Sequence, residues 1–243
     1  MQLLVSVAAV SEAHAALLGG ADVIDAKDPR QGALGAVRQV VLDAICTGVG
    51  AGRPVSAALG DEGPPALIEQ RARAAARRGA AFVKVGFRAA PTVSQARRRA
   101  AAARRGAGEG EGDGTRVVLV AYADWARAQS LAPDPLVALA ADTGAAGVLL
   151  DTAFKQAGLF ALLDTQTVRA WVAAAHDAGL FACLAGSLGG ADFATARALG
   201  ADLVGVRGAA CVGGRRGRVS RARVAALSAL TRATPLAAAA TLV

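Results

Sequence analysis

The sequence is poor in the side chains that most often bind metals, form disulfides or stack on bases. Its 243 residues include two histidines, three cysteines and 4% aromatic residues. Cys46, Cys183 and Cys211 have no close spacing, so they predict neither a disulfide framework nor a zinc motif, and a reduced cytoplasmic location is expected. His14 and His176 fall in predicted helices, which argues against a histidine base or a histidine-rich metal site. The sequence therefore predicts no metal and no cofactor.

Long apolar runs are also missing, although 54% of the residues are hydrophobic. No run approaches the roughly 18 residues that a membrane span needs. The N-terminal stretch MQLLVSVAAVSEAHA has no basic region, and Ser6 interrupts its apolar part. We interpret this stretch as a first strand that leads into a helix, and we expect no membrane partner.

The net charge of +8 raises the question of nucleic acid as a partner. Most of the arginines lie on alanine-rich helical stretches. Proteins that bind single strands also need aromatic side chains for stacking, and none interleave these arginines. A solvated helix face is therefore favoured, and no nucleic-acid partner is expected. Arg215, Arg216 and Arg218 follow a predicted strand and could instead meet an anionic substrate.

Lysine is the scarcest basic residue. Of the 27 basic residues, only Lys27, Lys84 and Lys155 are lysines. An arginine cannot be deprotonated in practice, whereas a lysine amine can lose its proton and form a Schiff base. The three lysines could have survived by chance in an arginine-rich sequence, but their positions on the predicted fold argue against chance.

A phrase of glycine, alanine and a small or acidic residue recurs before short apolar runs, at Gly20, Gly79, Gly144 and Gly200. Glycine suits the residue just past a helix end, where a left-handed conformation is required. A helix, a glycine stop and a strand, repeated, indicate βα units around a parallel sheet. A doubly wound sheet is the alternative, but no Gly-x-Gly-x-x-Gly turn follows the first strand.

The pattern predicts a single (β/α)₈ TIM-barrel domain over residues 1–243, with a flexible glycine- and glutamate-rich loop at 106–114. The predicted strands are 3–7, 22–27, 54–59, 82–87, 116–122, 147–151, 181–186 and 203–207. The predicted helices are 11–19, 35–47, 65–78, 92–105, 134–143, 165–178, 190–199 and 220–232.

Strand alternation brings the three lysines together. Asp25 and Lys27 share one face of their strand, which is the inner face if Ile24 contacts the helices. The same alternation places Lys84 inside the barrel, and Asp151 inside with Lys155 in the loop beyond. We therefore predict that these five groups meet at the C-terminal rim, where barrel enzymes carry their catalytic residues. A neighbouring amine and burial would lower a lysine pKa, and Asp25 and Asp151 would transfer protons or simply neutralise the lysines.

Two glycine-containing turns predict a phosphate site. They follow the seventh and eighth strands, where many barrels hold a phosphate through backbone N–H groups. Ser187 and Arg207 could add direct hydrogen bonds. The predicted phosphate-binding residues are Gly186, Ser187, Leu188, Gly189, Arg207 and Gly208.

The few aromatic residues contribute little to the predicted chemistry. Tyr122 and Asp124 end the fifth strand and could line the pocket, although a lone tyrosine is as often a packing residue. Trp125 and Trp171 are assigned to packing.

With these residues in view, the chain resembles the (5-formylfuran-3-yl)methyl phosphate synthase family, an early enzyme of methanofuran biosynthesis. The resemblance runs almost end to end and is carried by LLVS at 3–6, GGADVIDAKDPRQGALGA at 19–36, FVKVGF at 82–87, LLDT with Lys155 at 149–155, LAGSL at 184–188 and GVRGAAC at 205–211.

The resemblance implies a TIM barrel that condenses two molecules of glyceraldehyde 3-phosphate to a phosphorylated furan aldehyde, with loss of phosphate and water. It implies that Lys27 forms the Schiff base and that Lys84 is the acid and base. The expected partner is a phosphorylated triose, and a homo-oligomer is expected. Two alternatives stay open: another class I aldolase that acts on phosphorylated sugars, and a non-catalytic barrel whose lysines only bind anions.

Overall fold

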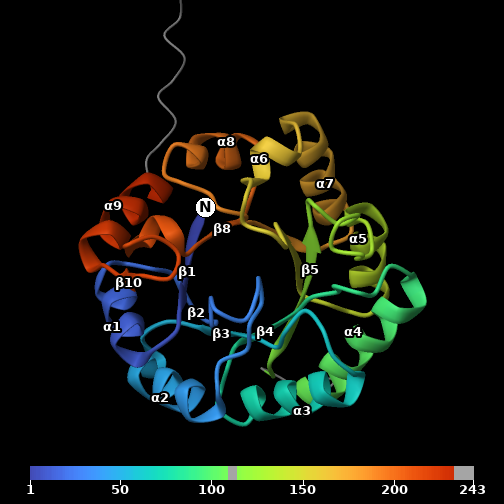
Figure 1. Ribbon diagram of the computed structural model, residues 1–243, viewed down its shortest axis with the longest axis horizontal. Helices are drawn as coiled ribbons and strands as arrows, with labels where there is room; N and C mark the ends of the chain where they lie inside the picture. Colours follow the sequence, from blue (N-terminus) through green and yellow to red (C-terminus); the bar gives the residue numbers. More distant parts are fainter. Residues whose placement is uncertain (109–113, 233–243) are drawn as a thin grey trace, which may run out of the picture.

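Eight parallel strands close into one barrel in chain order in the computed structural model, which describes residues 1–108 and 114–232 (Figure 1). The predicted TIM barrel is confirmed. The strands are β1 Gln2–Val7, β2 Val23–Ala26, β3 Val55–Ala58, β4 Phe82–Val85, β5 Arg116–Tyr122, β6 Gly147–Asp151, β7 Phe181–Leu184 and β8 Leu203–Val206.

Helices surround the barrel on its outside, as Figure 1 shows. Their apolar faces pack on the outward residues of the strands, such as Ile24 and Ala26, while the inward residues form a second, smaller cluster inside the barrel. The helices are α1 Val10–Leu18, α2 Gln39–Val49, α3 Pro65–Ala76, α4 Val93–Ala107, α5 Pro133–Asp142, α6 Leu159–Leu162, α7 Thr165–Asp177, α8 Asp192–Ala198 and α9 Arg221–Arg232.

The four recurring glycines end helices in the expected way. Gly20, Gly79, Gly144 and Gly200 have φ values of 87°, 73°, 62° and 87°, all in the left-handed region that glycine adopts without strain. In the first and last repeats the acidic residue also has a partner: Asp22 accepts the N–H of Leu3, for example, at 2.9 Å. The repeated phrase therefore turns the chain and joins neighbouring strands at the N-terminal face.

The helix predicted at 35–47 begins four residues later, at Gln39. The N–H of Asp28 donates to the carbonyl of Gly35 at 2.8 Å, and the Asp28 carboxylate accepts from the side chain of Gln31. These bonds close the segment between β2 and α2 into a loop. The chain thereby gains a long connection at the end of β2, directly after Lys27.

The boundary of the predicted 106–114 loop was wrong at its start. Gly106 and Ala107 are buried and belong to the last turn of α4. A Cβ on Gly106 would collide with the carbonyl of Glu69, so the glycine allows α4 to lie close against α3. Residues 109–113 of the predicted loop lie outside the described residues.

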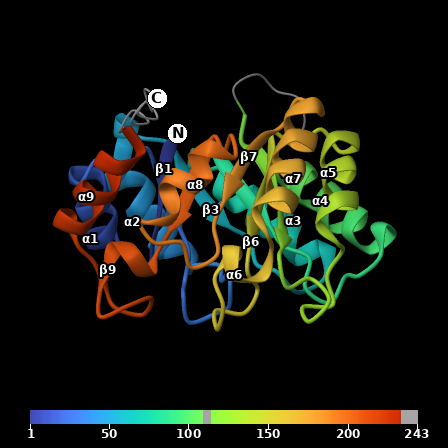
Figure 2. The same cartoon turned by 90° about the horizontal axis from the view of Figure 1, so that it is seen from above.

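Smaller elements were not predicted. They include the short helix α6, two 3₁₀ turns (Gly50–Gly52 and Gly208–Ala210), and a hairpin of β9 Cys211–Val212 with β10 Arg218–Val219. In Figure 2, α6 and β9 lie on one face of the barrel and the N-terminus on the opposite face. The face with α6 and β9 carries the loops that follow β6 and β8, so it is the C-terminal face.

The arginine-rich helices present charged residues on the outside of the barrel. Arg73 and Arg105 both pair with Glu69, and Arg97 pairs with Asp142 at 3.0 Å. About half of each of these arginine side chains is exposed, as expected for solvated helix faces. Within residues 1–108 and 114–232, none of the helices has both the length and the apolar character to cross a bilayer.

Candidate active site

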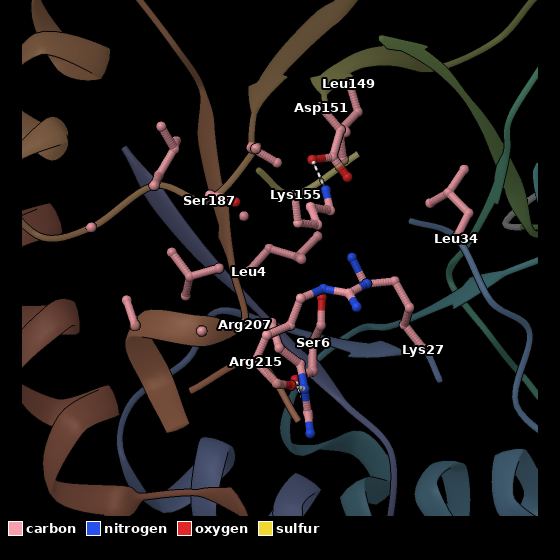
Figure 3. A pocket seen from close by; sticks show the side chains of 18 of the residues that line it. Leu4, Ser6, Lys27, Leu34, Leu149, Asp151, Lys155, Ser187, Arg207 and Arg215 are labelled. Atoms are coloured by element: carbon pink, nitrogen blue, oxygen red, sulfur yellow. Dashed lines mark hydrogen bonds and ion pairs between the residues drawn. The ribbon is translucent and has the colours of Figure 1, made fainter. Parts of the chain in front are cut away.

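A pocket of about 370 Å³ opens at the C-terminal ends of the strands (Figure 3). Lys27, Lys84, Asp151 and Lys155 line it, so four of the five predicted catalytic residues face one space. Asp25, the fifth, does not line the pocket; it is fully buried and paired with Lys84. The predicted convergence of the lysines is present in the structure.

Lys27 follows the last residue of β2, and its backbone N–H donates to the carbonyl of Val7 at 2.9 Å. Only 8% of the residue is exposed. Burial lowers its pKa to about 8; the charge of Asp151 opposes this shift and the charge of Lys84 reinforces it. At pH 7 roughly a tenth of such an amine is neutral, against about 0.04% for an ordinary lysine. Lys27 is therefore the group best suited to act as a nucleophile.

Asp25 and Lys84 form a buried ion pair inside the barrel. The Nζ of Lys84 lies 2.6 Å from Oδ1 of Asp25, and Ser6 donates to Oδ2 at 2.8 Å. Burial acts to raise the pKa of Asp25, but the charges of Lys84 and Lys27 and these contacts hold it below its usual value. Asp25 is therefore an ionised carboxylate that is paired with Lys84.

Asp151 and Lys155 form a second pair on the other side of the pocket. Lys155 Nζ donates to Oδ1 of Asp151 at 2.7 Å and to the carbonyl of Thr152 at 2.6 Å. Burial acts to raise the pKa of Asp151, but the charges of Lys155 and Lys27 and hydrogen bonds from Lys155 and the Thr152 N–H keep it low. Figure 3 shows this contact, with Lys27 directed into the same space.

Lys27 differs from the other two lysines in having no carboxylate of its own. Asp25 contacts Lys84 and Asp151 contacts Lys155. Among the described residues, no carboxylate oxygen lies within 4.0 Å of the Lys27 amine. Two positive and two negative charges therefore balance without Lys27. Because its own charge is not needed for neutrality, the amine can lose its proton at low electrostatic cost.

The turn after β7, where the sequence predicts a phosphate site, has an unusual backbone conformation. Gly186 has φ 96° and Ser187 has φ 57°, so a non-glycine residue adopts the left-handed conformation. Among the described residues, the N–H groups of Ser187 and Leu188 have no acceptor. Adjacent free N–H groups in such a turn form a concave site for an anion. Gly186, Ser187, Leu188, Gly189 and Gly208 all line the pocket.

Arg207 lines the pocket but is engaged by the protein itself. Its guanidinium donates to both carboxylate oxygens of Glu12 and to the carbonyls of Ser6, Arg215 and Gly217. A guanidinium has five N–H donors, and all five are used here. The direct hydrogen bond to a phosphate that the sequence suggested therefore has no free donor. Arg207 instead joins the loop after β8 to β1 and α1.

Arg215 is better placed to meet an anion. It lines the pocket, and its guanidinium bonds the carbonyls of Pro29 and Gly32 in the loop after β2. It thereby crosses from the loop after β8 to the loop after Lys27. The sequence indicated Arg215 by its place just beyond a strand; Arg216 and Arg218 line a neighbouring arginine-rich hollow instead.

Tyr122 and Asp124 do not line the pocket, contrary to expectation. Tyr122 is fully buried, with its hydroxyl 3.4 Å from Oδ2 of Asp61, and burial raises its pKa well above the usual value. Asp124 accepts the N–H groups of Ala153 and Phe154 at 2.7 and 2.9 Å. It therefore anchors the loop that carries Lys155.

Among the other side chains considered from the sequence, Trp171 is buried, as predicted, whereas Trp125 is 42% exposed and does not pack in the core. His176 lies on the surface and pairs with Asp202 at 2.9 Å. In the described parts of the chain, no cluster of three or more histidine, cysteine or carboxylate side chains could hold a metal ion.

Sequence reasoning missed Ser6, Glu12 and Asp61. Ser6 could have been found by strand alternation, because it is in register with Asp25 on the neighbouring strand. No local sequence pattern indicated a role for Glu12 or Asp61. Their partners lie 195 and 61 positions away in the sequence.

Comparison with known proteins identifies similar sequences along most of the chain. The family described as 4-HFC-P synthase matches residues 3–228. The (5-formylfuran-3-yl)methyl phosphate synthase of Methanopyrus kandleri is 40% identical over 89% of this chain and 92% of its own length. The synthase of the same name from Methanocaldococcus jannaschii is 37% identical over 95% and 99%. Phosphoribosyl anthranilate isomerase from Thermus thermophilus shares the fold alone, with 15% identity, a TM-score of 0.61 and coverage of 95% and 98%.

Proposed function

This chain belongs to the 4-HFC-P synthase family, and we propose that it condenses two molecules of glyceraldehyde 3-phosphate to (5-formylfuran-3-yl)methyl phosphate for a methanofuran-type cofactor. The names of its relatives supply the product. Two three-carbon phosphates provide its six carbons, and loss of one phosphoric acid and two waters balances the reaction. The observation that carries the proposal is the Lys27 amine: it is buried, has a pKa of about 8, and lies between two ion pairs that do not include it.

The first step is attack of the neutral Lys27 amine on the carbonyl carbon of a ketose that has formed from one triose. The nitrogen gains a bond to carbon, the carbonyl oxygen takes a proton, and loss of water leaves a protonated iminium. Lys155, held by Asp151, is the proton donor to the departing oxygen. The iminium withdraws electrons, so the neighbouring carbon can lose a proton and attack the aldehyde of the second triose.

Lys84 performs the later proton transfers. Its amine is paired with the ionised Asp25, and we assign it the role of an acid first and then, as the neutral amine, of a base. Elimination of phosphate and water drives the product to an aromatic ring. Asp25 stays ionised throughout and keeps Lys84 in position.

The turn at residues 186–189 binds a substrate phosphate through the free N–H groups of Ser187 and Leu188. The guanidinium of Arg215, at the opposite loop, supplies positive charge to the same pocket. We place the enzyme in a reducing compartment, the cytoplasm, where its three free cysteines stay reduced.

Borohydride reduction in the presence of glyceraldehyde 3-phosphate tests the proposal. A covalent adduct is expected on the peptide that contains Lys27, together with release of inorganic phosphate and a furan absorption band when the reductant is omitted. Lys27→Arg keeps charge and bulk but loses the nucleophilic amine, so it should fold normally and give neither adduct nor product. Lys84→Arg should give a slow adduct and no furan.

The remaining outcomes separate the alternatives. An adduct with reversible cleavage and no phosphate release would identify another class I aldolase. If no adduct forms, or if Lys27→Arg keeps substantial turnover, covalent catalysis at Lys27 is wrong, and a barrel that only binds anions becomes the better account.

A further inference from the structure

A second cavity, of about 540 Å³, enters the barrel from the N-terminal face, opposite the candidate active site. The first residues of several strands form its wall, among them Gln2, Val23, Phe82 and Leu203. Leu4, Lys84 and Leu149 line both this cavity and the active-site pocket. Lys84 therefore lies between two openings on opposite faces of the barrel.

Ser56 points to what the cavity binds. It is 1% exposed, it lines the cavity, and its Oγ has no hydrogen-bond partner among the described residues. Ser56 is in register with Asp25 on the neighbouring strand, so it lies beside the carboxylate that holds Lys84. A buried hydroxyl is normally paired, and water is its usual partner where the protein provides none.

The amine of Lys84 also has hydrogen-bond donors that the protein does not use. An ammonium group has three N–H bonds, and in the described part of the chain its ionic contact is with Asp25 alone. The mouth of the cavity is polar, with Arg116, Asp202 and Gln2 near bulk solvent, whereas its inner wall is mostly apolar. The volume is far larger than the roughly 30 Å³ that one water occupies in the liquid.

We propose that this cavity holds a chain of water molecules that joins Ser56 and Lys84 to solvent at the N-terminal face and returns protons to Lys84 during turnover. The inference rests on the proposed acid–base role of Lys84. Bound substrate fills the active-site pocket and displaces the water there, so the opposite opening is the route by which Lys84 exchanges protons.

The exchange leaves charge and atoms balanced. Lys84 gives one proton to the reacting atom and becomes the neutral amine. The nearest water gives a proton to that amine, takes one from the next water, and the last water takes one from solvent. No bond to carbon changes in this step, and Lys84 returns to the ammonium form.

Replacement of Ser56 tests the anchor of the water chain. Threonine and valine have the same shape, and only threonine keeps the hydroxyl, so Ser56→Thr is the matched control for Ser56→Val. Ser56→Val should lower kcat roughly three- to tenfold, the range for loss of one hydrogen bond, and should raise the solvent deuterium isotope effect on kcat. Ser56→Thr should keep both values, and the adduct at Lys27 should form at the normal rate in both variants.

Blocking the cavity gives a second test that does not depend on Ser56. Val23→Phe adds a ring to the cavity wall, away from the active-site pocket. In heavy water the unsubstituted enzyme should place solvent deuterium in the product, and Val23→Phe should retain more of the substrate's own hydrogen, as mass spectrometry would show. Thermal unfolding verifies that each variant folds.

Equal kcat and isotope effects in the Ser56 variants, with unchanged deuterium content in Val23→Phe, would overturn the water route while normal adduct formation left the proposed function standing. Absence of an adduct at Lys27 in the unsubstituted protein would overturn both.

Discussion

At the scale of single residues, the site depends on how two carboxylates are shared among three amines. Asp25 is paired with Lys84 and Asp151 with Lys155, each at less than 3 Å. Lys27 remains buried beside them without a counter-ion of its own, and its pKa falls to about 8. The lowered pKa of Lys27 thus results from its burial, while both nearby carboxylates form their ion pairs with the other two lysines.

The pKa of Lys27 predicts a pH profile. A lowered pKa means that the neutral amine becomes the main form at lower pH than for an ordinary lysine. The rate of adduct formation with glyceraldehyde 3-phosphate, followed by borohydride trapping under single-turnover conditions, should therefore rise with pH and reach half its maximum near pH 8. A midpoint in the usual lysine range, near 10.4, would contradict the burial argument.

The pairing also predicts an asymmetry in stability. Asp25→Asn leaves the buried Lys84 charge unpaired and should lower the free energy of unfolding by about 3 kcal/mol. Lys27→Met removes a buried amine that is not the direct ion-pair partner of either carboxylate. The free energy of unfolding should therefore change by less than about 1 kcal/mol. Urea denaturation near pH 7 measures both. Equal losses would show that Lys27 is a structural ion-pair partner.

At the scale of elements, the loops at the C-terminal face hold one another in place. The loop after β5 carries Asp124, whose carboxylate bonds two N–H groups of the loop after β6. That second loop carries Lys155. The position of Lys155, to which we assign a proton transfer, therefore depends on a residue that does not line the pocket.

Asp124→Ala should consequently lower kcat, by roughly tenfold, because two hydrogen bonds that fix the Lys155 loop are lost. Asp164 is the matched control: its carboxylate accepts the N–H of Thr167 as the N-cap of α7. Asp164→Ala removes this cap, so it should lower the free energy of unfolding slightly and leave kcat unchanged. Steady-state kinetics and urea denaturation on both variants separate the two roles, and equal kcat values would show that Asp124 has no positioning function.

At the scale of the whole molecule, the barrel closes where β8 meets β1, and Arg207 reinforces this closure. Its guanidinium joins residues near both ends of the chain, with Glu12 195 positions away and the Ser6 carbonyl 201 positions away. Burial acts to raise the pKa of Glu12, but its bonds to Arg207 and to backbone N–H groups hold it below the usual value, so the pair stays charged.

Arg207→Lys tests this closing role. One ammonium cannot satisfy acceptors that now receive five N–H bonds, so the variant should lose about 3 kcal/mol of stability in urea denaturation. Its KM for triose phosphate should change little at a temperature where it is folded, because Arg207 has no donor left for substrate. A large rise in KM with normal stability would instead restore the direct phosphate contact suggested by the sequence. The expected homo-oligomer stays a prediction, and size-exclusion chromatography would test it.

The sequence by itself determined the barrel, the order of its elements and the inward direction of Asp25, Lys27, Lys84 and Asp151, because strand alternation and glycine helix stops act over a few residues. The tertiary structure decided which amine pairs with which carboxylate. It also decided that all the donors of Arg207 bond to Glu12 and backbone carbonyls, and that a second cavity reaches Lys84. These features depend on contacts between residues far apart in the chain, whose distances and shared burial no local pattern encodes.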